Sequence, residues 1–359
     1  SSSVSLQGTM EQEITILPPA MEANSSQSPA AVSATHLVMA VLLFPTSLVG
    51  VVVNSLYLWV LRQKIRRTVT TLWFLNLVLC YLLFTLLIPF FAVYILLGYR
   101  WVFGTAMCKL FNTCISVGMF SCVFLLTLIS LDRYILTHHP VWSQNHRTLT
   151  HARKLVVGVW LVSFALSAPY LAFRETRMVD GGRIACVNNY NISRNWNGTK
   201  TRDLGRQIHL AVFVIRFLLG FLLPFCTIMG CYSQVRLEMK EKRPVWAGKP
   251  FKVMVAAVVS FFLGWLPYHF YQGLNFYTKA LPESVSDALL VIYTFTTCFT
   301  TCFTPILYLF VGENFWQVFR TSLPMLVKAG FDDELGSYSP ESSQRSAQSS
   351  LKHMHTSQG

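Results

Sequence analysis

One arginine stands out because of where it lies in the sequence. Seven stretches are long and apolar, and Arg216 is the only formal charge well inside any of them. A charged side chain inside a bilayer costs roughly 2.5–3.5 kcal/mol on insertion scales unless a partner or a water-filled cavity receives it. No Asp or Glu lies inside the other six stretches. The guanidinium therefore either reaches outward to the lipid headgroups or faces an open cavity that receives an anionic ligand.

The segment that precedes Arg216 favours the anion-binding interpretation. Residues 174–206 carry seven basic residues against three acidic ones, and Arg174 stands at their start. Such a field draws anions towards the mouth of a cavity. The first 36 residues are the reverse, with three glutamates and no Lys or Arg. The alternative is that the acidic tail folds onto the basic loop, so that the positive charge of the loop pairs with the tail rather than with a ligand.

The patterns of a catalytic or metal centre are missing. Neither His-Glu-x-x-His nor Gly-x-Ser-x-Gly occurs. Hydrolysis needs a nucleophile with a base in reach, yet His209 and His269, the histidines nearest to the centres of apolar stretches, both lie towards their ends. No Cys/His spacing suits a metal. We therefore expect no enzymatic activity, no cofactor and no metal.

The elements that must position these residues are membrane helices. Only 13% of the 359 residues are charged, against roughly 25% in a soluble domain. A helix needs about 20 apolar residues to cross a bilayer. Seven stretches reach or approach that length, so we predict an all-α membrane protein with a seven-transmembrane helix bundle. The stretches are 37–61, 68–99, 110–131, 155–173, 207–235, 253–278 and 288–312.

Glycosylation sequons and basic loops set the expected orientation. The sequons at Asn24, Asn191 and Asn197 all fall on one predicted side, which should be extracellular. Residues 62–67 and 236–252 on the other side are basic, as the positive-inside rule requires of cytoplasmic loops. We expect a multi-pass plasma-membrane protein with an extracellular N-terminus and a cytoplasmic C-terminus. The net charge of +13 is spread over such loops, which favours membrane lipid and argues against nucleic acid as its partner.

The remaining segments complete the domain plan. Residues 1–36 form an extracellular tail without the pattern of a cleavable signal peptide, and residues 37–310 form the bundle. Phe315, Trp316 and Phe319 recur at helical spacing, so residues 311–326 are predicted to be a short amphipathic helix on the inner membrane surface. Residues 327–359 are polar and Ser-rich, and we expect a disordered cytoplasmic tail. Its serines are either phosphorylated or simply solvated.

Two of the nine cysteines differ from the rest. Seven fall inside the predicted spans, where a thiol is usually a small packing residue. Cys108 lies at the outer end of the third span and Cys186 in the second outer loop. An oxidising exterior would join this pair into a disulfide, which would hold the loop across the mouth of the bundle.

At this point the sequence resembles a known family. Asp132-Arg133-Tyr134 stands at the inner end of the third span, 24 residues after Cys108. Further landmarks follow in the family's order, over roughly residues 37–325. The chain is identified as a member of the rhodopsin-like (class A) G-protein-coupled receptors, and segments 140–148 and 169–176 look like those of the chemoattractant group. The landmarks are Asn54, Trp101, Trp160, Pro224, Tyr232, Trp265, Pro267, Pro305 and Tyr308.

The resemblance implies roles for particular residues. Arg133 would pair with Asp132 at rest and be released on activation towards Tyr232 and Tyr308, opening a cleft for the G-protein. In the bundle interior, an activation switch would comprise Trp265, Phe261, Pro224 and Val123. Arg216 and Arg174 would hold the acidic group of the ligand. Five further positions match pocket-facing sites, although each could equally be helix packing: Phe91, Asn112, Met119, Tyr268 and Gln272.

The sequence also departs from the family pattern. Most members carry an Asp in the second span that helps to hold a sodium ion, and Tyr81 takes that place here. Cys122 and Thr304 stand where Ser and Asn are usual. Hard cations favour carboxylate oxygens, so we predict no sodium site. The departure also leaves open either high resting activity or weak G-protein signalling.

The most specific reading is therefore a receptor for an extracellular anionic chemoattractant, either a lipid acid or an acid-bearing peptide. Its partners would be an inhibitory-class heterotrimeric G-protein and arrestin, the latter through the phosphorylated Ser-rich tail. The alternative within the same fold is a scavenger receptor that is non-signalling or arrestin-biased. A transporter is the rival from another class, but neither internal repeats nor several midplane charges are present.

Overall fold

A computed structural model describes residues 34–63, 67–179, 182–190, 198–242 and 249–277, together with residues 285, 288–289, 291–296, 299–300 and 320–321. Apart from residues 320–321, these belong to the unit Ser1–Gly312; those two residues are helical and belong to the second unit, Glu313–Gly359. The predicted inner-surface helix (311–326), the tail (327–359) and the three sequons lie outside the described residues, apart from 320–321.

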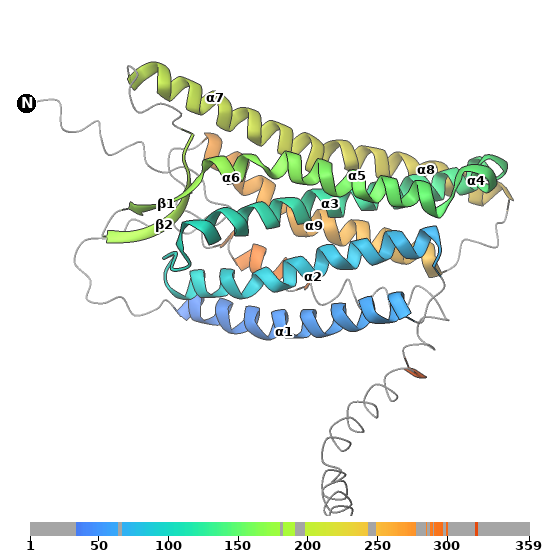
Figure 1. Ribbon diagram of the computed structural model, residues 1–359, viewed down its shortest axis with the longest axis horizontal. Coiled ribbons are helices and arrows are strands. Elements are labelled where there is room, and N and C mark those ends of the chain that lie inside the picture. Colours follow the sequence, from blue (N-terminus) through green and yellow to red (C-terminus); the bar gives the residue numbers. More distant parts are fainter. Residues whose placement is uncertain are drawn as a thin grey trace, which may run out of the picture. The chain divides into compact units, whose positions relative to one another are not determined.

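Long helices make up most of the first unit (Figure 1). The first three are α1 (Ala34–Gln63), α2 (Val69–Leu96) and α3 (Gly104–His138), and the short helix α4 (Pro140–His146) follows them. Next come α5 (Leu149–Ser167) and α6 (Pro169–Phe173), and then α7 (Gly198–Phe217), the π-helix η2 (Leu218–Leu222) and α8 (Leu223–Lys242). The helix α9 (Lys249–Tyr277) closes the described set of long helices.

Local sequence explains where several helices begin or change. Thr68 caps α2 by accepting a hydrogen bond from the Thr71 N–H at 3.2 Å, and Thr148 caps α5 in the same way. The predicted fourth span is broken into α5 and α6 just before Pro169. In the predicted fifth span, Pro224 has no N–H and its ring clashes with the carbonyl of residue 220. The wider π turn of η2 ends at Leu222, two residues before Pro224, and contains residue 220.

Five segments of the described chain are long and apolar enough to cross a membrane. They are Ala34–Arg62, Val69–Leu96, Gly104–His138, Leu149–Phe173 and Asp203–Leu237. The predicted sixth span corresponds to α9, whereas the predicted seventh, 288–312, is described only in part, with residues 291–296 helical. Many large apolar side chains of α1, α5 and α7 are exposed, as expected of helices whose outer faces contact lipid rather than water.

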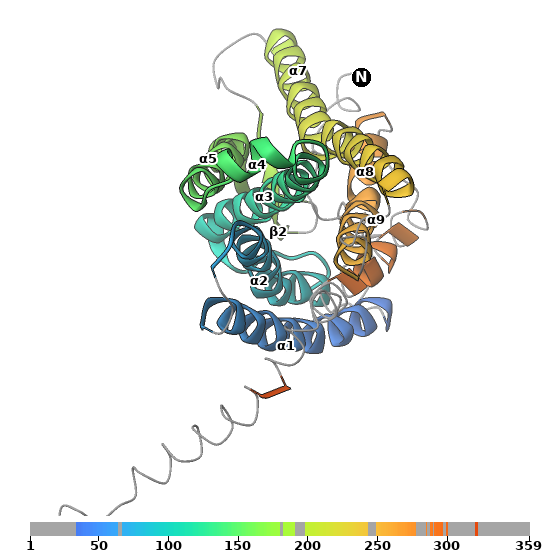
Figure 2. The same cartoon turned by 90° about the vertical axis from the view of Figure 1, so that its right-hand side faces the viewer.

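The helices pack around α3. Helix α1 packs on α2, α2 on α3, and α3 in turn on α5, α6, η2 and α8. Figure 2 looks along the helices and shows α3 flanked by α2, α5 and α8. Helix α9 meets α7, and its aromatic side chains reach the others through ring contacts such as Phe84–Trp265 at 5.6 Å. Side chains on α2, α3, α7 and α9 therefore face a common interior.

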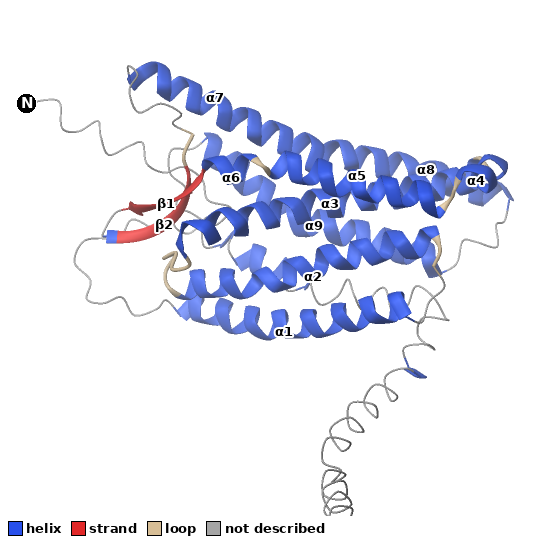
Figure 3. Cartoon of the chain, in the orientation of Figure 1, coloured by secondary structure: helices blue, strands red, loops and turns tan. Residues whose placement is uncertain are grey.

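A β-hairpin was not predicted in the basic loop, but the structure contains one (Figure 3). Strands β1 (Arg174–Val179) and β2 (Arg183–Asn188) pair antiparallel, with Thr176 opposite Cys186. We call the end of the bundle that carries these strands the hairpin end, and the opposite end, where α4 lies, the Asp132 end.

Candidate ligand-binding and signalling sites

The hairpin is fixed to the bundle by covalent and polar contacts. Cys108 at the start of α3 and Cys186 in β2 form the predicted disulfide, with their Cα atoms 5.7 Å apart. The backbone N–H of Trp101 donates to the Ile184 carbonyl at 2.8 Å, and the Arg183 side chain donates to the Gly98 carbonyl at 3.1 Å. A buried apolar cluster that contains Trp101, Cys108 and Cys186 lies beneath. These contacts hold Arg174, the first residue of β1, in a fixed place.

Arg216 points into the bundle. Its side chain is 5% exposed, and its two terminal nitrogens donate to the Ser116 hydroxyl of α3 at 2.8 Å and to the Tyr268 hydroxyl of α9. The alternative that Arg216 reaches outward to the headgroups is therefore wrong, because both terminal nitrogens bind interior partners. One arginine thus joins three helices at a single point.

Tyr170 brings the two predicted anion-binding arginines together. Its ring lies 4.4 Å from the guanidinium carbon of Arg216 and 5.5 Å from that of Arg174. Arg174 is 0% exposed, and one of its nitrogens donates to the Cys186 carbonyl at 3.1 Å. Contacts between cations and aromatic rings are strongest when both are desolvated. The ring therefore stabilises two positive charges that would otherwise repel each other.

The two guanidinium groups have hydrogen-bonding capacity left over. Within the described chain, Nε and Nη2 of Arg174 and Nε of Arg216 have no hydrogen-bond partner, and neither arginine forms an ion pair with a carboxylate. Burial lowers the pKa of the Arg174 guanidinium, and Arg216 lowers it further, while the nearby tyrosines oppose the change. Buried charges are normally paired, so this arrangement suits an added anion.

The other predicted pocket residues do not all join this cluster. Tyr268 does, through Arg216. Asn112 is buried under the disulfide, donating to the Cys108 carbonyl at 2.7 Å, and Phe91 packs edge-on against Tyr293 at 5.6 Å. Met119 is buried against η2, where a Cβ added at Gly220 would meet its methyl carbon. Gln272 is buried on α9, one turn from Tyr268.

Two members of the cluster, Tyr170 and Ser116, were missed by sequence reasoning. Ser116 carried a signal, because it lies four residues after Asn112 and three before Met119, and such residues share one face of a helix. Tyr170 carried little signal in the sequence, because no local pattern shows that the short helix α6 brings the Tyr170 ring next to Arg174 and Arg216.

The predicted activation-switch residues lie below the arginine cluster. Trp265 packs against Tyr268 at 5.5 Å between ring centroids, and against Phe261 at 6.2 Å. Val123 and Pro224 are buried on α3 and α8. The contacts thus run from Arg216 through Tyr268 to Trp265. Of the three residues behind the predicted absence of a sodium site, Tyr81 and Cys122 are both buried, and Thr304 lies outside the described residues.

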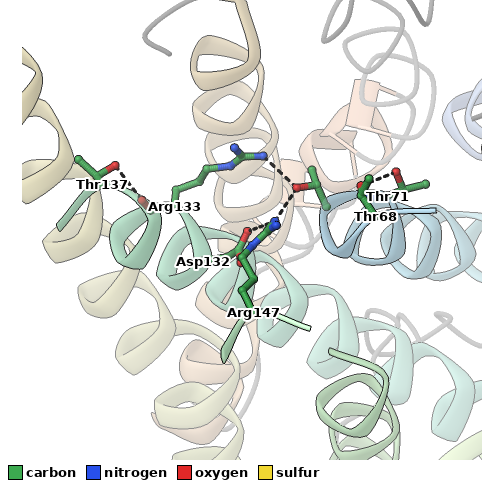
Figure 4. Close-up of polar contacts among 7 residues, drawn as sticks. Thr68, Thr71, Asp132, Arg133, Thr137 and Arg147 are labelled. Atoms are coloured by element: carbon green, nitrogen blue, oxygen red, sulfur yellow. Dashed lines mark hydrogen bonds and ion pairs between the residues drawn. The ribbon is translucent and has the colours of Figure 1, made fainter. Parts of the chain in front are cut away.

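At the Asp132 end the ion pair differs from the expected one. Asp132 is 9% exposed and pairs with Arg147, whose Nε and Nη2 lie 2.7 and 2.9 Å from its two carboxylate oxygens. The same Nη2 donates to the Thr70 hydroxyl of α2 at 2.8 Å. Figure 4 shows Arg147 reaching Asp132 from the chain beyond α4. We call these three residues the Asp132 clasp.

The predicted resting pair between Asp132 and Arg133 is therefore wrong for this structure. Neighbouring residues of a helix point in different directions, and the bidentate fork of Arg147 occupies both carboxylate oxygens. Arg133 makes a long 3.5 Å contact with the Thr70 hydroxyl, and it interacts electrostatically with Asp132 and more weakly with Tyr232 of α8, without an ion-pair contact to Asp132. Its Nε has no hydrogen-bond partner in the described chain. Tyr308, the other expected partner, lies outside the described residues.

This fold and these sites define a membrane receptor, and comparison with known proteins gives its family. Residues 53–308 match the model of the 7 transmembrane receptor (rhodopsin family), and the chain belongs to that family. It is thus a multi-pass plasma-membrane protein, an all-α seven-transmembrane bundle that couples to G-proteins, and its family is one of receptors rather than enzymes.

The most similar relatives include receptors from several mammals. The chain is 47% identical to probable G-protein coupled receptor 33 of Homo sapiens over 301 residues, covering 84% of this chain and 90% of the relative. The match to the same receptor of Rattus rattus is 48% over 302 residues, covering 84% and 88%. Chemerin-like receptor 1 of Homo sapiens is 36% identical over 311 residues, covering 85% and 83%. These relatives agree with the predicted chemoattractant group.

Proposed function

We propose that the chain is a receptor for an extracellular anionic chemoattractant, whose acidic group binds Arg174 and Arg216. One observation carries the proposal: two buried guanidinium groups flank one tyrosine ring, and three of their nitrogens have no hydrogen-bond partner in the described chain. A carboxylate is the group that best satisfies such donors, since charge-assisted hydrogen bonds are roughly twice as strong as neutral ones. The ligand is a lipid acid or an acid-bearing peptide.

The proposal includes an orientation and partners. The hairpin end faces outward and the Asp132 end inward, because the predicted order of spans puts the sequons on the first side and the basic loops on the second. The signal passes to an inhibitory-class heterotrimeric G-protein at the Asp132 end, and arrestin binds the phosphorylated serines of residues 327–359. The relationship to the chemoattractant group supports the inhibitory class.

The test compares acids with their uncharged counterparts. Cells carrying equal surface amounts of receptor are exposed to lipid acids and chemotactic peptides, each beside its methyl ester or C-terminal amide. Inhibitory G-protein activation and arrestin recruitment are both recorded. Arg216→Ala and Arg174→Ala should each weaken the acids about tenfold to a hundredfold, the loss of one charge-assisted contact. Arg206→Ala is the control, because it removes an exposed charge from the same helix.

Three results would change the conclusion. Equal potency of acids and esters, or equal effects of Arg206→Ala and Arg216→Ala, would show that no buried anion site exists. Arrestin recruitment without G-protein activation would favour the scavenger alternative. The buried Tyr81, in place of the family's usual carboxylate, is the observation that favours that alternative.

A further inference from the structure

A cavity lies beside the arginine cluster, between α5, α6 and α7. Its volume is about 130 Å³. Its buried lining residues are Arg216 and Tyr170, Phe120 of α3, and Asn188 and Tyr190 at the end of the hairpin. The rest of the wall is largely apolar and includes Leu166, Val212 and Ile215. An apolar cavity of about 150 Å³ holds a benzene molecule, so this one has room for a ring or a short run of methylene groups.

The cavity extends to the surface of the bundle that faces lipid. Ala165 of α5 and Ile215 of α7 line it, and both are exposed, Ile215 by 47%. Leu161 and Val214, large apolar residues outside the lining, are exposed on the same two helices. Helix α5 packs on α2, α3 and α6, and α7 packs on α9. The opening therefore lies between two helices whose outer surfaces contact acyl chains.

This arrangement places a cation at the inner end of an apolar passage. An acyl chain is the occupant that matches the passage, because its neighbours at the opening are other acyl chains and its apolar surface meets apolar walls. A carboxylate at the end of that chain is the group that matches Arg216, whose Nε has no hydrogen-bond partner in the described chain. A peptide that arrived from the hairpin end would not need an opening to lipid.

We propose that the activating ligand is a single-chain amphiphilic acid that enters from the bilayer between α5 and α7, with its carboxylate on Arg216 and its chain in this cavity. The inference rests on the proposed function, because it specifies which acid the arginines receive. It adds the route of entry and chooses the lipid acid over the peptide.

The experiment locates the chain directly. The full-length receptor is placed in phosphatidylcholine bilayer discs with a straight-chain carboxylic acid that carries a photoreactive diazirine on its chain, and labelled residues are identified by mass spectrometry. The methyl ester of the same probe serves as the uncharged control. We expect labelling at the cavity lining of α5 and α7, strong for the acid and at least about tenfold weaker in Arg216→Ala.

Two pairs of variants separate blocking of the cavity from general damage. Val212→Phe puts a ring into the cavity, whereas Val214→Phe adds the same ring two residues along, outside the lining. Ala165→Phe and Leu161→Phe form the second pair on α5. Overpacking should weaken labelling roughly fivefold to a hundredfold in the first member of each pair. The second member should label like the wild type, which also shows that the helix tolerates the ring.

The outcomes distinguish this inference from the proposed function. If the acid binds in an Arg216-dependent manner but labels only residues outside the cavity, the lateral site is refuted while the anion site stands. If acid and ester label the cavity equally and independently of Arg216, the cavity holds bulk bilayer lipid only, and the proposal is overturned. If no binding depends on Arg216, both proposals fail together.

Discussion

Substitution of Arg147 should weaken the interaction with the G-protein, because in the Asp132 clasp Arg147 takes the carboxylate oxygens that Arg133 could otherwise bind. In the structure both carboxylate oxygens of Asp132 bind the Arg147 guanidinium. Arg133 is left half-buried with one long contact to Thr70 and an Nε that has no hydrogen-bond partner in the described chain. In Arg147→Ala, Asp132 becomes a nearly buried carboxylate without its partner. The nearest cation it can recruit is Arg133.

The size of the effect follows from the burial of the groups. Hydrogen bonds to charged groups contribute about 1.5–3 kcal/mol, but the Arg147 side chain is 22% exposed and solvent reduces that figure. A new pair between Asp132 and Arg133 should therefore be worth about 1–2 kcal/mol. This free energy must be lost again when Arg133 engages a G-protein. At RT of about 0.59 kcal/mol, the affinity for the G-protein falls roughly fivefold to thirtyfold.

The assay needs no ligand. Purified receptor in bilayer discs is titrated with nucleotide-free heterotrimeric G-protein, and Kd is compared among wild type, Arg147→Ala and Gln144→Ala. Gln144 is exposed on α4 and serves as the control. Adding Asp132→Asn to Arg147→Ala should restore most of the affinity, because the carboxamide cannot hold Arg133 as an ion pair. A higher affinity in Arg147→Ala would refute the reasoning, since it would show that the clasp itself is the restraint.

Three further predictions concern the hairpin end and the interior. Cys186→Ser should lower the free energy of unfolding by about 2–5 kcal/mol, the usual cost of losing a native disulfide, measured by thermal unfolding of the purified receptor. Gly118→Ala should lower the free energy of unfolding by about 1–3 kcal/mol through overpacking, because the added Cβ would lie 2.7 Å from the Phe84 ring. Gly158→Ala is the control, since its Cβ would meet nothing within 4 Å. Equal unfolding temperatures of the two variants would contradict the expectation. Tyr170→Leu should reduce the potency of active acids about tenfold or more, as loss of a desolvated cation–aromatic contact predicts, with unchanged potency as the opposing result.

The helices and the disulfide were predictable because their signals are local and strong. Charge-free stretches of about 20 residues mark membrane helices whatever their neighbours, and the predicted ends of the first and sixth spans lie within a few residues of α1 and α9. The pairing of Cys108 with Cys186 followed from their location at one side of the membrane. The hairpin was not predicted, although the sequence contains a signal for it. Asp180-Gly181-Gly182 is a typical turn sequence.

The polar contacts inside the bundle could not be predicted in the same way. The Asp132–Arg147 pair joins residues 15 positions apart through the chain reversal at α4, and the adjacent Arg133 was the more obvious partner in sequence. The sequence predicted that Arg174 and Arg216 bind the ligand, but not that both contact the ring of Tyr170. Tyr170 completes it only because α5 ends at Ser167 and α6 turns the chain before β1 begins.

Aromatic packing runs from the arginine cluster to Tyr81. Trp265 meets Tyr268 above and Phe84 beside it, and Phe84 in turn meets Tyr81 at 6.4 Å. Tyr81 stands at the position where the resemblance to this family predicts a sodium-binding carboxylate. A ligand that draws Arg216 away from Tyr268 would change the support of Trp265 and, through Phe84, that of Tyr81. Close-packed interiors transmit such displacements because they contain little free volume. Tyr81 in place of a carboxylate therefore continues the packing that begins at the arginine cluster.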